Sequence, residues 1–494
     1  MSGQSYWAES APAGHPRASA AGTIDADVCI VGAGLTGLWT AYYLARADPA
    51  LSIVVLEKET VGFGASGRNG GWCSALFPRS AASLERTYGF RRAVAMRQAM
   101  VDTVAEMGAV TAAEGISCDF VQGGTLVYAM NAVQEQAARA DVLEAARFGV
   151  DLVEYREFGA RAGGAGDPVA AAGHPAGARG ATFDPACARL HPLKLVRGLA
   201  DVVEGLGVTI YEHTEVTGWS SGRVEFVGGD EGGVRAKQIV IATEAYGSQL
   251  PGVGRRIMPL YSLMIATEPL PDAFWNSVGI PHGTTFSDYR HLLIYGQRTA
   301  DNRFAFGGRG ARYHWGSSIR PAYDQVARVF DHLAATLVDL FPDAFDAEVT
   351  HRWGGPLGVS RDWHATVNYN ARTGVAFAGG YVGDGLSTTN LAGRTLAALL
   401  TGVDASHVAG AGGSSGAGAG AGGASGRGVS SAAVPYDLTR LPWVNHVSPR
   451  WEPEPLRFIG ANLGLASADL ADREEQLTAR ASRTARLLGP LTGH

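Results

Sequence analysis

The sequence predicts an α/β fold in which a domain with a parallel sheet carries an inserted domain built on an antiparallel sheet (α+β). Three observations predict this fold. A glycine-rich turn joins a β-branched segment to a helical one within residues 28–46, a second apolar segment follows at 51–57, and residues 259–310 contain alternating segments. With 494 residues, the chain is long enough for two domains that share an interface.

The first elements form a βαβ unit. Residues 28–31 are apolar and mostly β-branched, which predicts a strand, and residues 35–46 have the apolar spacing of a helix. Residues 51–57 predict the next strand. The later elements expected from periodicity are, in order, helices at 84–115 and 133–149 separated by the strand segment "DFVQGGTLVYAM", a helix at 192–206, strands in "VTIYEHTEVTGW", "RVEFVGG" and "AKQIVIATEAYGS", and helices at 323–340 and 389–400.

Composition and charge exclude a nucleic-acid-binding protein. The formal net charge is −6 and lysine occurs only at Lys58, Lys194 and Lys237, so no concentrated basic surface is expected. The four cysteines form no CxxC pair, which predicts reduced thiols and no metal site. The N-terminus lacks the apolar core of a signal peptide, and glycines and threonines interrupt the uncharged run 28–45. We therefore expect a cytoplasmic protein without a transmembrane span.

A glycine-rich turn follows the first strand and opens the first helix. Gly32, Gly34 and Gly37 form the pattern GxGxxG in "GAGLTG". The first glycine permits the tight turn, the second lets a pyrophosphate approach the backbone, and the third lets helix and strand pack closely. Glu57 ends the second strand, where its carboxylate can accept hydrogen bonds from a ribose. These features predict a Rossmann-type nucleotide-binding domain and do not separate FAD from NAD.

Two further glycine-rich segments carry a family resemblance. Residues 60–80 form a glycine-dense loop with "GASGRNGGW", where an NAD dehydrogenase would proceed to another βαβ unit, and residues 379–394 read "GGYVGDGLSTTNLAGR". With "DVCIVGAGLTGLWTAYYLA", these segments resemble the D-amino-acid oxidase and glycine oxidase superfamily of FAD enzymes. The resemblance is greatest to its γ-glutamylputrescine oxidase and aminophosphonate oxidoreductase branch. It runs from "SYW" near the N-terminus to about residue 402.

The resemblance implies that FAD is the cofactor and is bound non-covalently. Some relatives link the flavin through a histidine in the loop after the ribose carboxylate, but the polar residues of this loop are Ser66, Arg68 and Asn69. Other relatives use a cysteine in the C-terminal half, and no cysteine follows Cys187. The expected cofactor contacts are Gly32, Gly34, Leu35, Thr36, Gly37, Glu57, Lys58, Ala65, Ser66, Arg68, Asn69, Gly70, Gly71, Val216, Gly380, Gly383, Gly385, Leu386, Ser387 and Thr388.

Asp384 departs from the family pattern. A neutral residue or histidine is commoner between Gly383 and Gly385, at the start of a helix whose dipole stabilises negative charge on the reduced flavin. A carboxylate there would oppose that stabilisation. We therefore expect Asp384 to point outward or to bind the substrate amine.

The resemblance also implies an FAD-dependent amine or amino-acid oxidoreductase, either an oxidase or a dehydrogenase. Such enzymes pass a hydride from the carbon next to nitrogen to flavin N5, and water hydrolyses the resulting imine. Desolvation can supply the neutral amine, so no dedicated base is predicted. The candidate substrate contacts are Tyr295, His291, Trp353 and Arg309, and strand alternation would place His291, Leu293 and Tyr295 on one face.

Two alternatives stay open. The "GD" pair at 383–384 also resembles aromatic hydroxylases, which favours an FAD- and NAD(P)H-dependent monooxygenase. The glycine-rich linker and the C-terminal amphipathic helix favour a non-catalytic flavin-fold interaction module. Expected partners are a small amine or amino-acid substrate and an electron acceptor, either oxygen or another one, with homo-oligomerisation left open. The predicted domains are an N-terminal arm (1–27), an FAD-binding domain (28–110, 185–258 and 360–402), a substrate-binding domain (111–184 and 259–359), a flexible linker (409–428) and a C-terminal extension (435–494).

Overall fold

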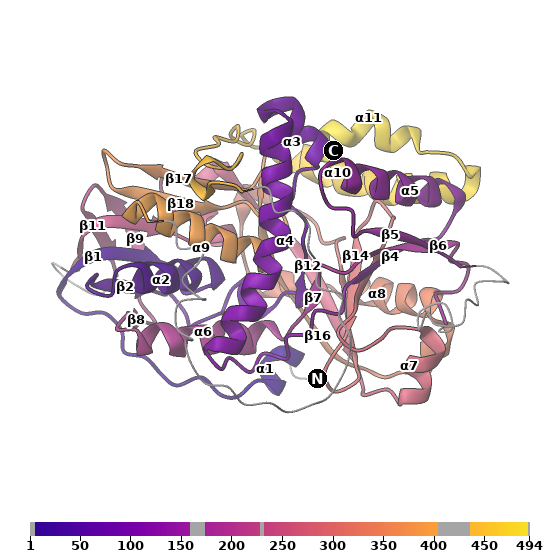
Figure 1. The fold of residues 1–494 in the computed structure, drawn as a ribbon, viewed down its shortest axis with the longest axis horizontal. Helices are drawn as coiled ribbons and strands as arrows, with labels where there is room; N and C mark the ends of the chain where they lie inside the picture. Colours follow the sequence, from indigo (N-terminus) through magenta and orange to yellow (C-terminus); the bar gives the residue numbers. More distant parts are fainter. Residues whose placement is uncertain (1–4, 159–172, 228–231, 404–434, 493–494) are drawn as a thin grey trace.

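The computed structural model describes residues 5–158, 173–227, 232–403 and 435–492 and contains two large sheets side by side (Figure 1). The predicted linker at 409–428 lies outside the described residues. The first sheet has the order β17-β18-β11-β1-β2-β8, and the β9–β10 hairpin pairs with β11. Its strands are β1 (Thr23–Val31), β2 (Ile53–Leu56), β8 (Thr209–Tyr211), β9 (Val216–Ser220), β10 (Arg223–Phe226), β11 (Gly233–Ile241), β17 (Thr366–Asn370) and β18 (Val375–Gly379).

The centre of the first sheet is parallel and buried on both faces. Val28 and Ile30 of β1 belong to one hydrophobic cluster, and Cys29 and Val31 belong to another on the opposite face. This explains why the strand is a continuous apolar run rather than an alternating one. β1 pairs in parallel with β11 and β2, and β11 pairs in parallel with β18. The ends of these strands therefore lie together at one edge of the sheet.

Helices cover this sheet and the boundary between the two sheets (Figure 1). α2 is buried from Leu35 to Ala45 because α6, α9 and the sheet surround it. Gly393 permits the close approach of α9, since a Cβ there would lie 2.6 Å from the carbonyl carbon of Trp39. The helices are α1 (Tyr6–Ser10), α2 (Leu35–Ala47), α3 (Ala81–Tyr88), α4 (Phe90–Ala113), α5 (Ala132–Arg147), α6 (Pro192–Gly205), α7 (Asp272–Val278), α8 (Ala327–Leu340), α9 (Gly385–Thr401), α10 (Leu456–Thr478) and α11 (Arg483–Thr492).

The second sheet has the order β16-β12-β15-β14-β13-β4-β6-β5. It is antiparallel as predicted, except that β13 and β4 pair in parallel. An aromatic-rich core packs α8 against this sheet. Its strands are β4 (Thr125–Ala129), β5 (Glu154–Glu157), β6 (Gly180–Asp184), β12 (Ile257–Thr267), β13 (Thr285–Asp288), β14 (Ile294–Arg298), β15 (Phe304–Gly308) and β16 (Val349–Ser360), and the short strands β3 (Trp72–Cys73) and β7 (Ala188–Arg189) pair separately.

Several predicted boundaries are wrong for identifiable reasons. The helix expected at 84–115 is divided into α3 and α4 at Gly89, whose φ of 87° is incompatible with a continuous helix. The helix expected from Tyr323 begins at Ala327, after a 3₁₀ turn at Pro321–Asp324. α9 begins at Gly385 rather than at Thr389. None of the described helices is long and apolar enough to cross a membrane.

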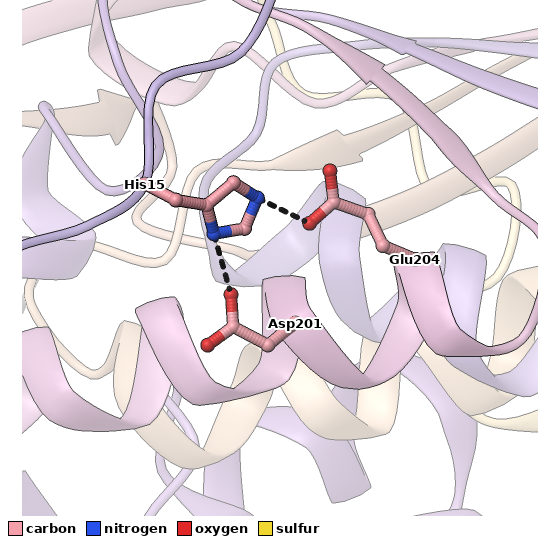
Figure 2. A group of neighbouring side chains, drawn as sticks. All are labelled: His15, Asp201 and Glu204. Carbon is pink, nitrogen blue, oxygen red and sulfur yellow. Dashed lines mark ion pairs between the residues drawn. The ribbon is translucent and has the colours of Figure 1, made fainter.

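The N-terminal segment packs along the body. The side chains of Tyr6 and Trp7 are buried, and the Trp7 indole donates a hydrogen bond to the Asn69 carbonyl at 2.8 Å. Figure 2 shows His15 further along, between Asp201 and Glu204 of α6. Arg17 pairs with the same two carboxylates and with Glu212, so this cluster fastens the segment to α6 and to the end of β8.

Candidate active site

The GxGxxG turn connects β1 to α2 through three sterically restricted glycines. Gly32 has a φ of 108°, and a Cβ there would lie 2.7 Å from the Ala242 carbonyl oxygen at the end of β11. A Cβ on Gly37 would overlap the Gly32 carbonyl. Gly34 is the N-cap of α2 and has no side chain to cap the helix. The helix N-terminus therefore presents backbone N–H groups and the positive end of its dipole, which suits a pyrophosphate.

Glu57 follows β2, and the backbone orients its carboxylate. One oxygen accepts a hydrogen bond from the Ala33 N–H at 2.8 Å, and the other accepts one from the Glu59 N–H at 3.0 Å. Burial raises the pKa of Glu57, and these two amides oppose the shift. A carboxylate held in this way keeps its remaining lone pairs for hydroxyl donors such as those of a ribose.

The loop at 64–72 folds back on itself under the second sheet. Asn69 donates to the carbonyls of Ala65 and Ser66 and accepts a hydrogen bond from the Gly71 N–H at 2.8 Å. A Cβ on Gly70 would lie 2.5 Å from the Tyr295 ring. The glycines of this loop therefore permit the close approach of a strand from the other sheet.

Arg68 in this loop is paired within the protein. Its guanidinium lies 2.7 Å from an Asp324 carboxylate oxygen and donates to the Gly354 carbonyl at 3.2 Å. The indole of Trp353 donates to the Arg68 carbonyl at 2.9 Å. The charge of Arg68, which we expected to contact the cofactor, is thus shared with Asp324.

The second glycine-rich segment forms the loop between β18 and α9. Gly380, Val382 and Gly383 have φ values of 75°, 58° and 109°, so the loop makes sharp turns before the helix begins. The Tyr381 hydroxyl lies 3.1 Å from the Thr36 hydroxyl of α2. This contact joins the two cofactor signatures into one wall.

A cavity of about 700 Å³ lies between these loops and the second sheet. This volume is within the usual range of small-molecule sites, about 300–1,000 Å³. Gly37, Gly71, Gly380, Ser387 and Thr388 lie outside its wall; the Ser387 hydroxyl instead donates to the Ser74 carbonyl at 2.6 Å. The predicted contacts that line the cavity are Gly32, Gly34, Leu35, Thr36, Glu57, Lys58, Ala65, Ser66, Arg68, Asn69, Gly70, Val216, Gly383, Gly385, Leu386, Tyr295 and Arg309.

Tyr295 and Arg309 enter this cavity from β14 and the end of β15. The Tyr295 hydroxyl lies 2.9 Å from the Ser262 hydroxyl, and burial raises the pKa of the phenol. Arg309 donates to the Val382 carbonyl at 2.8 Å and lies over the Trp363 ring. Leu293 also lines the cavity. A phenol and a guanidinium at one site can bind an anionic group of a substrate.

The structure does not bring His291 and Trp353 to the cavity wall. The expected alternation fails at His291 because β14 begins only at Ile294, and the preceding residues form bends. His291 Nε2 instead lies 3.1 Å from a Glu475 oxygen of α10. Trp353 is buried and donates a hydrogen bond to the backbone of the 64–72 loop.

Among the cavity carboxyl groups that were not predicted from the sequence are those of Glu244 and Asp324. Glu244 follows β11, adopts a φ of 44° and accepts a hydrogen bond from the Tyr381 N–H at 3.1 Å. Burial raises its pKa to about 7. Asp324 comes from the 3₁₀ turn before α8. No motif marks either residue, because each reaches the cavity only through the packing of distant segments.

These residues fit FAD. The uncapped helix N-terminus, the oriented carboxylate at the end of β2 and the backbone-rich loop all belong to one cavity wall. The four cysteines are buried, and none lines this wall. Burial raises the pKa of Cys29 to about 12 and that of Cys118 to about 11, so these thiols are poor nucleophiles. This agrees with the expectation of non-covalent binding.

Comparisons with known proteins point to a family of flavoenzymes. A family model described as FAD dependent oxidoreductase (DAO) matches residues 27–399. The chain is 32% identical to γ-glutamylputrescine oxidoreductase of Escherichia coli over 401 residues, which are 81% of this chain and 89% of that protein. Among solved structures, glycine oxidase from Geobacillus kaustophilus matches with a TM-score of 0.63 at 22% identity, covering 76% of this chain and 95% of that one. L-proline dehydrogenase from P. horikoshii also matches with a TM-score of 0.63, at 17% identity, covering 77% and 94%.

Proposed function

The chain belongs to the DAO family of FAD-dependent oxidoreductases, and from this premise we propose that it oxidises a C–N bond of a small amine or amino acid. The family resemblance, the fold class and the FAD cofactor predicted from the sequence are confirmed. The observation that carries the proposal is the shared cavity, in which the two cofactor signatures face Tyr295 and Arg309 of the second sheet. The names of the relatives support it, since they include an amine oxidoreductase and an amino-acid oxidase.

The residues of the chain have distinct tasks in this reaction. FAD, when bound, accepts the hydride from the carbon next to the substrate nitrogen. Arg309 binds an anionic group of the substrate and Tyr295 closes the cavity above the 64–72 loop. Leu293, Ile319 and Leu357 contribute apolar wall, which excludes water and favours the neutral amine needed for oxidation.

An anaerobic spectroscopic titration tests the proposal. Purified holoenzyme is mixed with a panel of amines, amino acids and aminophosphonates while the flavin absorbance is followed. Bleaching by a panel member supports amine oxidation and identifies the substrate class, and readmission of air separates an oxidase from a dehydrogenase. Bleaching by NADPH alone would contradict the proposal and favour a monooxygenase. Purified protein that contains no flavin and takes up none would favour the non-catalytic module.

A further inference from the structure

Asp384 places in the cavity a carboxylate that receives no hydrogen bond from the described residues. It occupies the N-cap position of α9, but its side chain makes no capping hydrogen bond. Only its backbone is engaged, because its N–H donates to the Tyr381 carbonyl at 2.9 Å and its carbonyl accepts from the Thr388 hydroxyl. Within the described parts of the chain, no side chain or backbone group hydrogen-bonds to this carboxylate. This carboxylate is therefore free to bind a cationic group of a ligand in the cavity.

The groups around Asp384 fix its charge. Burial raises the pKa of Asp384 to about 6, and the charge of Arg309, which also lines the cavity, opposes this shift. The Tyr295 phenol interacts with the same guanidinium, and Glu244 accepts a hydrogen bond from the Tyr381 N–H in the loop that carries Asp384. The N-terminus of α9 further favours the ionised form. Asp384 is therefore an anion at neutral pH and is close to neutrality under mildly acidic conditions.

Arg309 does not neutralise Asp384 by direct contact. Its one hydrogen bond to a described residue goes to the Val382 carbonyl, and its guanidinium stacks 4.9 Å from the centre of the Trp363 ring. The two side chains therefore provide one anionic and one cationic contact in the same part of the cavity. A substrate with an ammonium group and an anionic group would satisfy both.

We propose that Asp384 is a catalytic residue that accepts the proton of the substrate ammonium group. This inference rests on the proposed amine oxidation. The N–H bond of the ammonium breaks, and its proton moves to the Asp384 carboxylate, which leaves a neutral amine. That amine loses a hydride from its neighbouring carbon to FAD, the oxidant, and becomes an iminium ion, which water hydrolyses to a carbonyl compound and ammonium. The proton on Asp384 passes to solvent when the product leaves. In this chain, formation of the neutral amine thus depends on proton transfer to Asp384 and not on desolvation alone.

The pH dependence of flavin reduction tests the proposal. The holoenzyme and its D384N variant are mixed anaerobically with the amine found by the panel, between pH 5 and 10. The wild-type rate should rise through an ionisation near pH 6 and then level off. The D384N rate should be lower by at least about tenfold at pH 7.5, since a positioned proton acceptor contributes about 10²–10⁴-fold. The deficit should shrink as pH nears the pKa of the free amine, about 10 for an alkylamine.

Two further measurements separate catalysis from structure. D384E keeps a carboxylate and should regain part of the rate at pH 7.5, whereas a purely structural role would respond to both variants alike. Binding of 2-aminoisobutyrate, which has no hydrogen on the carbon next to nitrogen, is followed by its perturbation of the flavin spectrum. D384N should weaken this binding by about tenfold at pH 7.5. An unchanged pH profile and unchanged binding in D384N would overturn the role of Asp384, whereas failure of every amine to reduce the wild type would overturn the proposed function itself.

Discussion

Replacement of Glu57 by glutamine should weaken FAD binding without removing the fold. In the wild type, the two carboxylate oxygens accept hydrogen bonds from the N–H groups of Ala33 and Glu59. A glutamine has one acceptor oxygen, so in E57Q one of these amides faces an NH₂ donor instead. The side chain then either rotates or loses an acceptor position, and both outcomes weaken its hydrogen bonds to a ribose.

The expected size of the effect follows from the hydrogen bonds involved. A hydrogen bond to a charged acceptor contributes about 1.5–3 kcal/mol, and each 1.4 kcal/mol changes Kd about tenfold. Loss of one such bond to a ribose hydroxyl predicts a rise in the FAD Kd of about 10- to 100-fold. The amide left facing a donor should also lower the free energy of unfolding of the apoprotein by about 1–3 kcal/mol.

Titration of apoprotein with FAD, followed by quenching of flavin fluorescence, measures this effect. E215Q is the matched control, because Glu215 also lines the cavity but forms an exposed ion pair with Lys58 at 2.7 Å. Exposed pairs contribute about 0–1 kcal/mol, so E215Q should change Kd by less than about fivefold. A Kd for E57Q within twofold of the wild-type value would refute the assignment of Glu57 to the cofactor.

Three other substitutions test further parts of the site. G70A would place a Cβ 2.5 Å from the Tyr295 ring, so it should lower the free energy of unfolding by about 1–3 kcal/mol and slow flavin reduction; G64A, with 3.3 Å of clearance, is the control, and equal Tm values would contradict the reasoning. The raised pKa of Glu244, about 7, means that the fold favours its protonated form. Wild-type apoprotein should lose stability as pH rises from about 4.5 through 7, and E244Q should lose less; parallel Tm profiles between pH 5 and 8 would count against this. W7A removes a buried indole and its hydrogen bond to Asn69 and should lower the free energy of unfolding by about 3–5 kcal/mol in denaturant titrations, whereas a change under 1 kcal/mol would show that the N-terminal segment is dispensable.

The half of the cavity that the glycine-rich segments form was predictable because local sequence determines it. Three features form this half: the GxGxxG turn, the acid at the end of β2 and the loop at 64–72. Each lies at the boundary of a helix or strand and needs a particular backbone conformation, and neighbouring residues predict both the boundary and the conformation. The substrate half depends on packing between distant segments. His291 lies three residues before β14, where the alternation rule does not apply, and its partner Glu475 is on α10. Similarly, Glu244 gains its environment from Tyr381, 137 residues away.

The loop at 64–72 shows how the two halves constrain each other. It receives hydrogen bonds from Trp7 of the N-terminal segment and from Trp353 of β16, and Arg68 within it pairs with Asp324 before α8. The two tryptophans bind carbonyl groups of the loop backbone, and Arg68 contributes its charge. The glycines leave room for the ring of Tyr295. A loop held from three directions cannot move without disturbing the second sheet. The proposed cofactor site and the shape of the cavity therefore depend on the same nine residues, a segment with four glycines and one arginine paired within the protein.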